Sequence, residues 1–222
     1  MSERGVTFLI HSQAGRSSLL RDVLYAVVGQ VHPEVTALVM MSDGDGNHAS
    51  LDLVSRMDGL GGVQVRALTG PGEMAAAFNA GLVMVETEYC AFLGDLDLVY
   101  PRHAALLTGC LERAPGAHAA QGAAYASRGH LAPDGFITHR KQRQPIVAAA
   151  SVAAPAAFLL RTAKLQGAGT AFDTANGVDC RPALLERLAA RAKVAVVDQP
   201  VAEVRSIEAS DGSTYPRDMT TP

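Results

Sequence analysis

The sequence has no marked excess of charge of either sign and few cysteines. Its 19 basic and 22 acidic residues leave a formal net charge of −3. Binding to a nucleic-acid backbone depends on a basic surface, so nucleic acid is not an expected partner. The three cysteines (Cys90, Cys110 and Cys180) are odd in number and have no CxxC spacing. This excludes a disulfide scaffold and predicts free, buried thiols in a cytoplasmic protein.

Long hydrophobic runs are also missing. The apolar run over residues 6–10 ends at His11-Ser12-Gln13, and the alanine-rich stretch AAASVAAPAAFLL is interrupted by Pro155. Both runs are shorter than a membrane span needs, so we expect a soluble protein with neither a signal peptide nor a transmembrane helix. The sequence also has no GxGxxG or Walker pattern, no HExxH and no nucleophile elbow.

Short apolar runs that alternate with helical patterns are what the sequence does contain. Strands are expected over 6–10, 35–41, 63–68, 89–93, 121–127, 135–137 and 193–198. Helices are expected over 17–30, 51–60, 73–85, 104–113 and 182–192. Such alternation predicts an α/β layered fold around a mixed, mainly parallel sheet.

Three of the expected strands end in small and polar residues. The stretches are HSQAGR after the first strand, SDGDGN after the second and GDLD after the fourth. Ligands of open α/β sheets collect at the carboxyl ends of the strands, so these stretches together predict a binding site. Asp95 and Asp97 of GDLD follow a buried strand and need a cation, a hydroxyl group or a surface position to compensate for lost hydration.

The order of these motifs resembles the family 2 glycosyltransferases, which have the GT-A fold. Members carry PTYNR, DDGSxD, ARNxGL and FLDxDDxxxP in this order, and then an acidic pair after a GxFD turn. This chain has, in the same order, LIHSQAGR, VTALVMMSDGDGN, AFNAGL, EYCAFLGDLDLVYPRH and GTAFDTANGVD. The correspondence extends over most of the chain.

The resemblance implies one GT-A-like domain over residues 1–205, with a nucleotide-binding half (1–103), an acceptor-side half (104–205) and a polar tail (206–222). It also implies a hexosyl or related transferase. Such an enzyme moves a sugar from a nucleoside-diphosphate-sugar donor to an acceptor hydroxyl group, with inversion at the anomeric carbon. The acceptor is not identified by the sequence, and a homo-oligomer stays open.

Asp95 and Asp97 lie where the family has its metal-binding acidic cluster. The resemblance therefore implies Mg²⁺ or Mn²⁺ bound by Asp95 and Asp97, since both metals prefer oxygen ligands, with Asp95 also near the nucleotide. Without a gap in the alignment, however, Gly94 and Leu96 occupy positions where the family usually has carboxylates. The alternative is that the two aspartates only cap the next helix.

Asp179, in GVDCRPALLERL, occupies the position of the residue that activates the acceptor in the family. The resemblance implies that Asp179 is the catalytic base, a role that requires hydrogen-bond reach to the acceptor hydroxyl. Asp179 could equally cap the helix that follows, because an aspartate at a helix start satisfies free backbone amides.

The remaining implied residues hold the nucleotide: Ser12, Gln13, Asp43 and Asn79. Asp43 lies in an Asp-Gly turn, which ordinary loops also use. Phe78 stands where the family has an arginine that faces the diphosphate. Basic residues between His139 and Arg143 are candidates to supply that charge.

These substitutions leave two rival functions open. A non-catalytic GT-A-like binding protein that has lost its donor site would account for the replacement of charged family residues by Ser42, Phe78, Gly94 and Leu96. A nucleotidyltransferase would have a similar sheet, but the first strand lacks the glycine-rich basic loop that binds triphosphates.

Overall fold

The computed structural model describes residues 5–42, 47–128, 135–137, 154–166, 172–174, 180–208 and 214–215. The strands are β1 (Val6–Ser12), β2 (Val35–Ser42), β3 (Gln64–Gly70), β4 (Tyr89–Gly94), β5 (Asp97–Val99), β6 (Ala117–Arg128), β7 (Gly135–Ile137), β8 (Phe158–Arg161), β9 (Lys193–Glu208) and β10 (Thr214–Tyr215). The helices are α1 (Ser17–Val28), α2 (His48–Met57), α3 (Met74–Val83), α4 (His103–Arg113), α6 (Thr162–Gln166) and α7 (Arg181–Arg191), with 3-10 turns η2 (Leu60–Gly62) and η4 (Pro155–Ala157).

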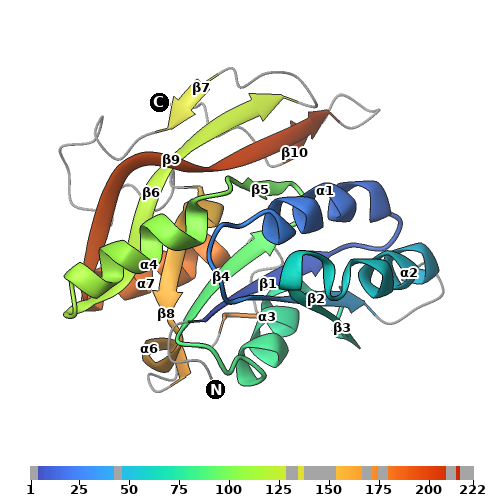
Figure 1. The fold of residues 1–222 in the computed structure, drawn as a ribbon, viewed down its shortest axis with the longest axis horizontal. Coiled ribbons are helices and arrows are strands. Elements are labelled where there is room, and N and C mark those ends of the chain that lie inside the picture. The colour runs from blue at the N-terminus through green and yellow to red at the C-terminus, as the bar shows by residue number, and fades with distance from the viewer. Residues whose placement is uncertain are drawn as a thin grey trace.

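The described strands form a single mixed sheet in the order β10-β9-β6-β8-β4-β1-β2-β3, with β5 paired to β9 and β7 paired to β6. Strands β4, β1, β2 and β3 run parallel to one another. Strand β8 runs antiparallel to both β4 and β6. In Figure 1, β6 and β9 bend over one side of the molecule, away from the flatter region around β1 and β2. The predicted mixed α/β sheet is confirmed.

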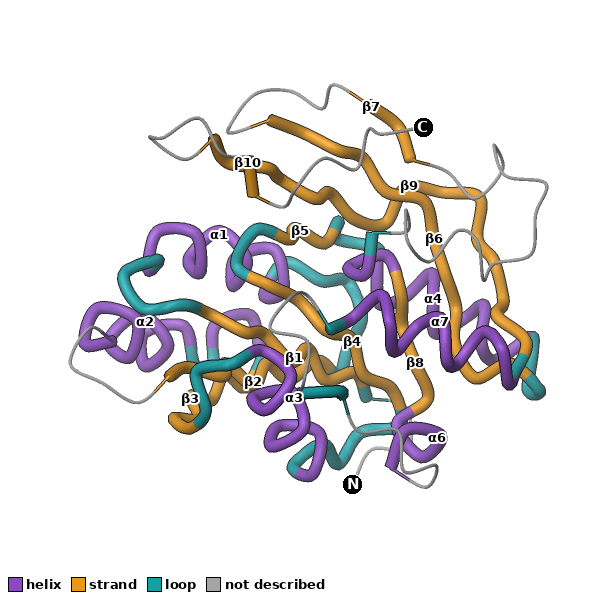
Figure 2. Tube along the Cα trace, turned by 180° about the vertical axis from the view of Figure 1, so that it is seen from behind, coloured by secondary structure: helices purple, strands orange, loops and turns teal. Residues whose placement is uncertain are grey.

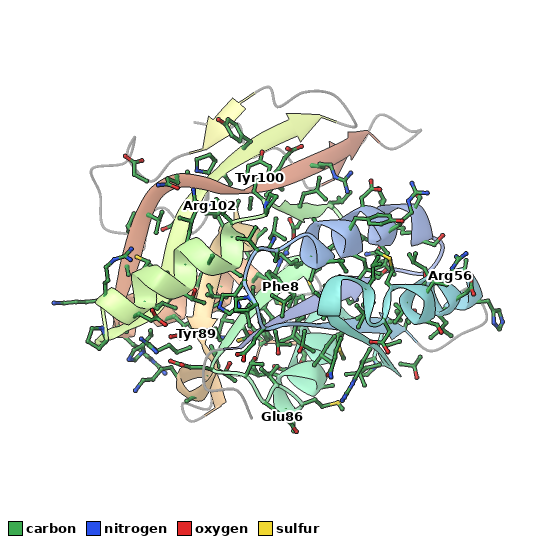
Figure 3. The ribbon with its side chains drawn as sticks, viewed as in Figure 1. Phe8, Arg56, Glu86, Tyr89, Tyr100 and Arg102 are labelled. Carbon is green, nitrogen blue, oxygen red and sulfur yellow. The ribbon has the colours of Figure 1, made fainter. Side chains whose placement is uncertain are left out.

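Alternation along the central strands gives the sheet two apolar faces. Phe8 and Ile10 of β1 face the layer that contains α1, α2 and α4, whereas Leu9 faces the layer that contains α3 and α7. Helices α1, α2 and α4 lie in front of the sheet in Figure 1, and α3 and α7 lie in front in the reverse view of Figure 2. The fully buried Phe8 ring lies 5.5 Å from the His103 ring and is labelled in the interior in Figure 3.

Helix α1 shows how the sequence pattern produces this packing. Its buried residues are Leu20, Val23, Leu24 and Val27, which recur at the spacing of one helix face. Helix α3 is almost apolar throughout, and Gly81 allows it to pack closely on β1 and β2. A Cβ atom at Gly81 would lie only 2.5 Å from Leu9 and 2.9 Å from Met40. Tight packing therefore fixes α3 on the sheet.

Most elements agree with the predictions, including the later strands expected over 121–127 and 135–137 and the helix expected over 182–192. Each strand and helix expected up to residue 113 is present, with ends that shift by a few residues. Strands β5 and β8 and helix α6 were not predicted. Strand β9 was predicted to end at Asp198 but continues to Glu208, and β10 follows it, so part of the segment assigned to a polar tail is strand.

The structure also bears on the cysteines and on membrane-spanning helices. Cys90, Cys110 and Cys180 are all buried and form no disulfide, as predicted. Within the described ranges, no helix combines the length and the apolar character that crossing a membrane requires.

Candidate functional site

The strand register brings three predicted polar stretches to one edge of the sheet. His11 of β1 is paired with Gly94 of β4, and Ser12 is paired with Met41 of β2. Since these strands are parallel, their carboxyl ends meet. The loop after β1, the end of β2 and the GDLD turn after β4 are therefore neighbours, as the sequence predicted.

Asp95 lies in the two-residue turn between β4 and β5 and contacts the loop after β1. Its Oδ2 accepts a hydrogen bond of 3.3 Å from the backbone N–H of Gln13, and its Oδ1 accepts one of 3.2 Å from Nη1 of Arg16. Gly15, with φ of +78°, provides the turn that places Arg16 there, since this backbone conformation favours glycine. Asp95 is thus already bound to a cation, although not to a metal ion.

Asp97 is the first residue of β5 and is deeply buried. Its Oδ2 accepts a hydrogen bond of 2.7 Å from the backbone N–H of Gly94, which closes the turn. The same oxygen forms an ion pair with Nη1 of Arg181, the first residue of α7. The Asp97 and Arg181 side chains are only 2% and 9% exposed, so this is an ion pair of the interior.

Arg181 was missed by the sequence analysis, although a signal for it exists. The amino-terminal end of a helix carries partial positive charge, so an arginine in the first helical position is unfavourable unless something compensates for it. Arg181 occupies that position directly before Pro182. Its Nη1 also lies 3.4 Å from the Phe92 carbonyl oxygen, as a hydrogen-bond donor. The placement of Arg181 is consistent with the buried anionic partner, Asp97, that the structure shows.

His11 links the first strand to the loop before α3. Its Nε2 lies 2.9 Å from the carbonyl oxygen of Gly72, and its ring meets the edge of Phe78 at a centroid distance of 6.2 Å. Burial lowers the pKa of His11 below its ordinary value; the Gly72 hydrogen bond and the charge of Asp95 oppose that shift. His11 is therefore neutral at pH 7 and contributes no positive charge to this edge of the sheet.

Phe78 fills the place where the family has an arginine. It is fully buried, and its ring lies 5.1 Å from Phe92 and 5.3 Å from Phe172. The neighbouring Asn79 is hydrogen-bonded to Phe172 in both directions: its Nδ2 donates to the Phe172 carbonyl oxygen at 3.0 Å, and its Oδ1 accepts from the Phe172 N–H at 2.6 Å. Asn79 therefore fixes the segment around Phe172 on α3.

Two buried polar atoms near the strand ends have no hydrogen-bond partner among the described residues. They are Oγ of Ser12 and Oδ1 of Asn47, whose residues are 1% and 2% exposed. The Nδ2 of Asn47 donates to the carbonyl oxygen of Ser42. Buried polar atoms without partners are costly, so this part of the strand ends is less well satisfied than the surrounding core.

Some predicted site residues fall outside the described residues. They are Asp43, Asp179 and the basic residues His139, Arg140, Lys141 and Arg143. Ser12, Gln13, Asp95 and Asp97 are brought together at the edge formed by β1 and β4. Asn79 lies on α3 and is hydrogen-bonded to the backbone of Phe172.

The donor set does not fit a divalent metal ion in its present arrangement. Among the described residues, no group of three or more histidine, cysteine, aspartate or glutamate side chains is placed to hold a metal ion. Asp95 and Asp97 are each engaged by an arginine. Gly94 contributes no side-chain oxygen. A cation would first have to displace guanidinium groups that already neutralise both carboxylates.

Comparison with known proteins identifies the fold. TarS 1–349 of S. aureus, solved in complex with UDP-GlcNAc, matches 92% of this chain with a TM-score of 0.72 and 16% sequence identity. The same protein in complex with UDP matches 90% with a TM-score of 0.72 and 15% identity. The mannosyltransferase PcManGT from Pyrobaculum calidifontis, solved with GDP-Man and Mn²⁺, matches 96% with a TM-score of 0.66 and 15% identity.

At this level of identity the likeness shows the fold, and the GT-A-like architecture expected from the motif order is confirmed. The chain spans 60% of the length of TarS 1–349 and 59% of the length of PcManGT. No protein-family model and no curated protein sequence matches the chain.

Proposed function

We propose that the chain is a glycosyltransferase that moves a sugar from a nucleoside-diphosphate-sugar donor to an acceptor hydroxyl group. The observation that carries this proposal is the meeting of Ser12, Asp95 and Asp97 with two arginines at the carboxyl ends of β1 and β4. Ligands of open α/β sheets bind at this edge. The fold-level neighbours were solved with UDP, UDP-GlcNAc and GDP-Man, which supports a nucleotide-sugar donor.

In the proposed reaction, the acceptor oxygen forms a bond to the anomeric carbon of the donor sugar. The bond from that carbon to the diphosphate oxygen breaks, and the nucleoside diphosphate leaves with the electron pair. We assign the acceptor proton to the Asp179 carboxylate, the residue that corresponds to the family's base. Attack from the side opposite the leaving group inverts the anomeric carbon. The negative charge that gathers on the diphosphate needs positively charged groups nearby.

The nucleoside end of the donor is assigned to the loop after β1 and the end of β2. The exposed Gln13 is offered to the base or ribose, and Ser12, Asp43 and Asn79 stay predicted contributors; within the described ranges the Oγ of Ser12 has no hydrogen-bond partner. Mg²⁺ or Mn²⁺ at Asp95 and Asp97, which the resemblance implied, would require both carboxylates to release their arginines. A homo-oligomeric state and a cytoplasmic location remain predictions of the same kind, and the acceptor is not identified.

The experiment that tests this function is a thermal-shift titration with UDP, GDP, TDP and CDP, each in EDTA and in Mn²⁺. A nucleotide that binds only the folded protein raises its stability, by about 2.7 kcal/mol at ~100 times the dissociation constant. We expect one nucleotide to shift the transition and the others not to. Absence of a shift with every nucleotide would contradict the proposal.

The role of Asp179 is tested by replacing its carboxylate. Asp179→Asn is expected to lower turnover by orders of magnitude, because the acceptor hydroxyl loses its base, and to leave nucleotide affinity nearly unchanged. Turnover is measured as nucleoside diphosphate released from the sugar nucleotide that carries the stabilising nucleotide. A variant with normal turnover would show that another group takes the proton.

One observation favours a second function, a GT-A-like binding protein without a donor site. Phe78 and its partners Phe92 and Phe172 pack as an aromatic cluster where the family has a diphosphate-facing arginine. Under this alternative the pocket has been replaced by core. The thermal-shift titration separates the two functions. The transferase should be stabilised by one nucleotide, and the binding protein without a donor site should be stabilised by none.

A further inference from the structure

The two carboxylates of the GDLD turn are both paired with arginines. Asp95 is held by Arg16, and Asp97 is held by Arg181. Two guanidinium groups carry the same total charge as one divalent cation, and they lie against the same two carboxylates that would be its ligands. The local charge balance of a metal site is therefore reached with side chains alone.

Gly94 adds a second observation. A Cβ atom built on Gly94 would lie 3.7 Å and 3.8 Å from the two terminal nitrogens of Arg181, and 3.6 Å from Oδ2 of Asp97. The side of Gly94 on which a carboxylate would project thus faces a guanidinium group. Position 94 has no carboxylate, and the space beside it is taken by the Arg181 guanidinium group. The protein's own side chain therefore provides the cation at this place.

We propose, on the premise of the function proposed above, that the donor site binds its nucleotide sugar without a divalent cation. Arg181 neutralises Asp97 in the interior, and Arg16 binds the diphosphate from the exposed side of its ion pair with Asp95. The ligand class is a nucleoside diphosphate or its sugar ester.

The two arginines suit different tasks. The Arg181 side chain is 9% exposed and is held against Asp97 and the Phe92 carbonyl oxygen. The Arg16 side chain is 36% exposed, whereas its partner Asp95 is only 7% exposed. A guanidinium group has five N–H donors in a planar fork that matches phosphate oxygens, so Arg16 can contact a phosphate while Nη1 stays on Asp95.

The neighbourhood of Arg16 favours an anion as well. Arg16 directly precedes α1, whose amino-terminal end carries partial positive charge. Its backbone carbonyl already accepts a hydrogen bond from the Leu20 N–H at 3.0 Å, so the backbone is fixed while the side chain points to Asp95. The diphosphate would thus meet a held guanidinium group beside a helix start.

Calorimetric titration of UDP and of GDP, in EDTA and again in excess Mn²⁺, tests the inference. We expect one of the two nucleotides to bind in EDTA, with a dissociation constant that changes by less than about threefold in Mn²⁺. Arg16→Gln is expected to weaken binding of that diphosphate in EDTA by about tenfold or more. The variant should also reduce the preference for the diphosphate over the matching monophosphate, which a purely structural role would leave unchanged.

Arg56→Gln is the matched control. Arg56 is an exposed arginine on α2 that pairs with Asp52, and Figure 3 labels it near the outer end of that helix. Its replacement removes the same charge and should leave affinity unchanged. Arg16→Gln is suited to the test because its ion pair is partly exposed, so the variant is expected to fold; its unfolding curve checks this.

The outcomes separate the inference from the proposed function. Nucleotide binding that requires Mn²⁺, and that Asp95→Asn abolishes, would overturn the inference and support the transferase. Unchanged diphosphate affinity in folded Arg16→Gln would also overturn it. Failure of both nucleotides to bind under both conditions, and of TDP and CDP as well, would contradict the transferase itself.

Discussion

The amino-terminal part of the molecule (residues 5–102) and the carboxyl-terminal part (103–208) are built differently. The first part repeats strand and helix, with parallel strands β1, β2 and β4 that end together at the candidate site. The second part contains the long paired strands β6 and β9, rich in small residues, and its described contribution to the site is Arg181. The first part therefore provides the strand ends and carboxylates, and the second provides a buried cation.

The ion pair between Asp97 and Arg181 joins these two parts, and its removal is expected to have the largest effect. Arg181→Gln leaves a buried carboxylate without its cation and should lower the free energy of unfolding by about 3–5 kcal/mol. Urea denaturation measures the change. The double variant Asp97→Asn/Arg181→Gln is the control, because it removes both charges together and should lose less than the two single changes added. A loss below 1 kcal/mol in Arg181→Gln would show that the pair does not hold the parts together.

Close backbone packing differs between the two parts, and two glycines allow a matched comparison. In β6, a Cβ atom on Gly122 would lie 2.4 Å, 2.7 Å and 3.1 Å from the Cγ2, Cγ1 and Cβ atoms of Val201. On α3, the Cβ atom of Gly81 would meet the far ends of Leu9 and Met40. Valine is stiff, whereas leucine and methionine can change rotamer.

Gly122→Ala is therefore expected to cost about 3 kcal/mol, and Gly81→Ala about 1 kcal/mol, partly because alanine favours a helix. Both values come from urea denaturation under one set of conditions. Equal losses in the two variants would mean that the two parts tolerate close packing equally well.

The pH dependence of stability is expected to come largely from His103, at the start of α4. Burial lowers the pKa of His103 to about 4, although its Nε2 lies 2.9 Å from the Ala156 carbonyl oxygen. The unfolded chain takes up a proton near pH 6.5 and the folded chain only near pH 4, so stability falls as pH drops through this window. The loss from this residue between pH 7 and pH 5 should be about 2 kcal/mol.

Denaturation at several pH values measures this slope, and His103→Gln is expected to flatten it. Some slope should remain in the variant, because burial also lowers the pKa values of His11 and His118. If the wild-type protein and His103→Gln have the same pH dependence, the assignment to His103 is wrong.

The smallest effect on stability is expected from the other ion pair, within the amino-terminal part. Arg16 is 36% exposed, and exposed ion pairs contribute little to folding. Arg16→Gln should lower the free energy of unfolding by about 0.5 kcal/mol, measured in urea. If Arg16→Gln lowered the free energy of unfolding as much as Arg181→Gln does, both ion pairs would be structural. The Arg16 pair could then not be regarded as open to a ligand.

What the sequence could predict depended on whether an element is encoded by a local pattern or by a pairing between distant residues. Strand β1 and helix α1 are encoded by local patterns, an apolar run and a helix-spaced stripe, and both were predicted. The meeting of Ser12 with the GDLD turn followed from the rule that parallel strands end at one edge. Local patterns were therefore sufficient for the frame of the site.

Interactions between distant residues were not predictable in this way. Strand β5 has three residues, and it exists because Val99 and its neighbours pair with β9, about a hundred positions later. Strand β8 is buried without alternation, so its sequence could not be told apart from an alanine-rich core segment. The partner of Asp97 was missed because no local pattern links position 97 to position 181. The positions of Asp95 and Asp97 at the strand ends could be predicted from the sequence, but the pairing of each with its own arginine could not.

The separation of Asp97 and Arg181 along the chain has a consequence for synthesis. Chains grow from the amino terminus, and early segments can begin to fold while later ones are still being made. Strands β1, β2 and β4 and the carboxylate of Asp97 all precede residue 100, whereas Arg181 follows 84 positions after Asp97. A nascent chain that ends near residue 100 therefore contains Asp97 but not the arginine that neutralises it. Asp97 therefore gains its cation only after α7 has been synthesised, and its strand partner in β9, Val204, is synthesised later still.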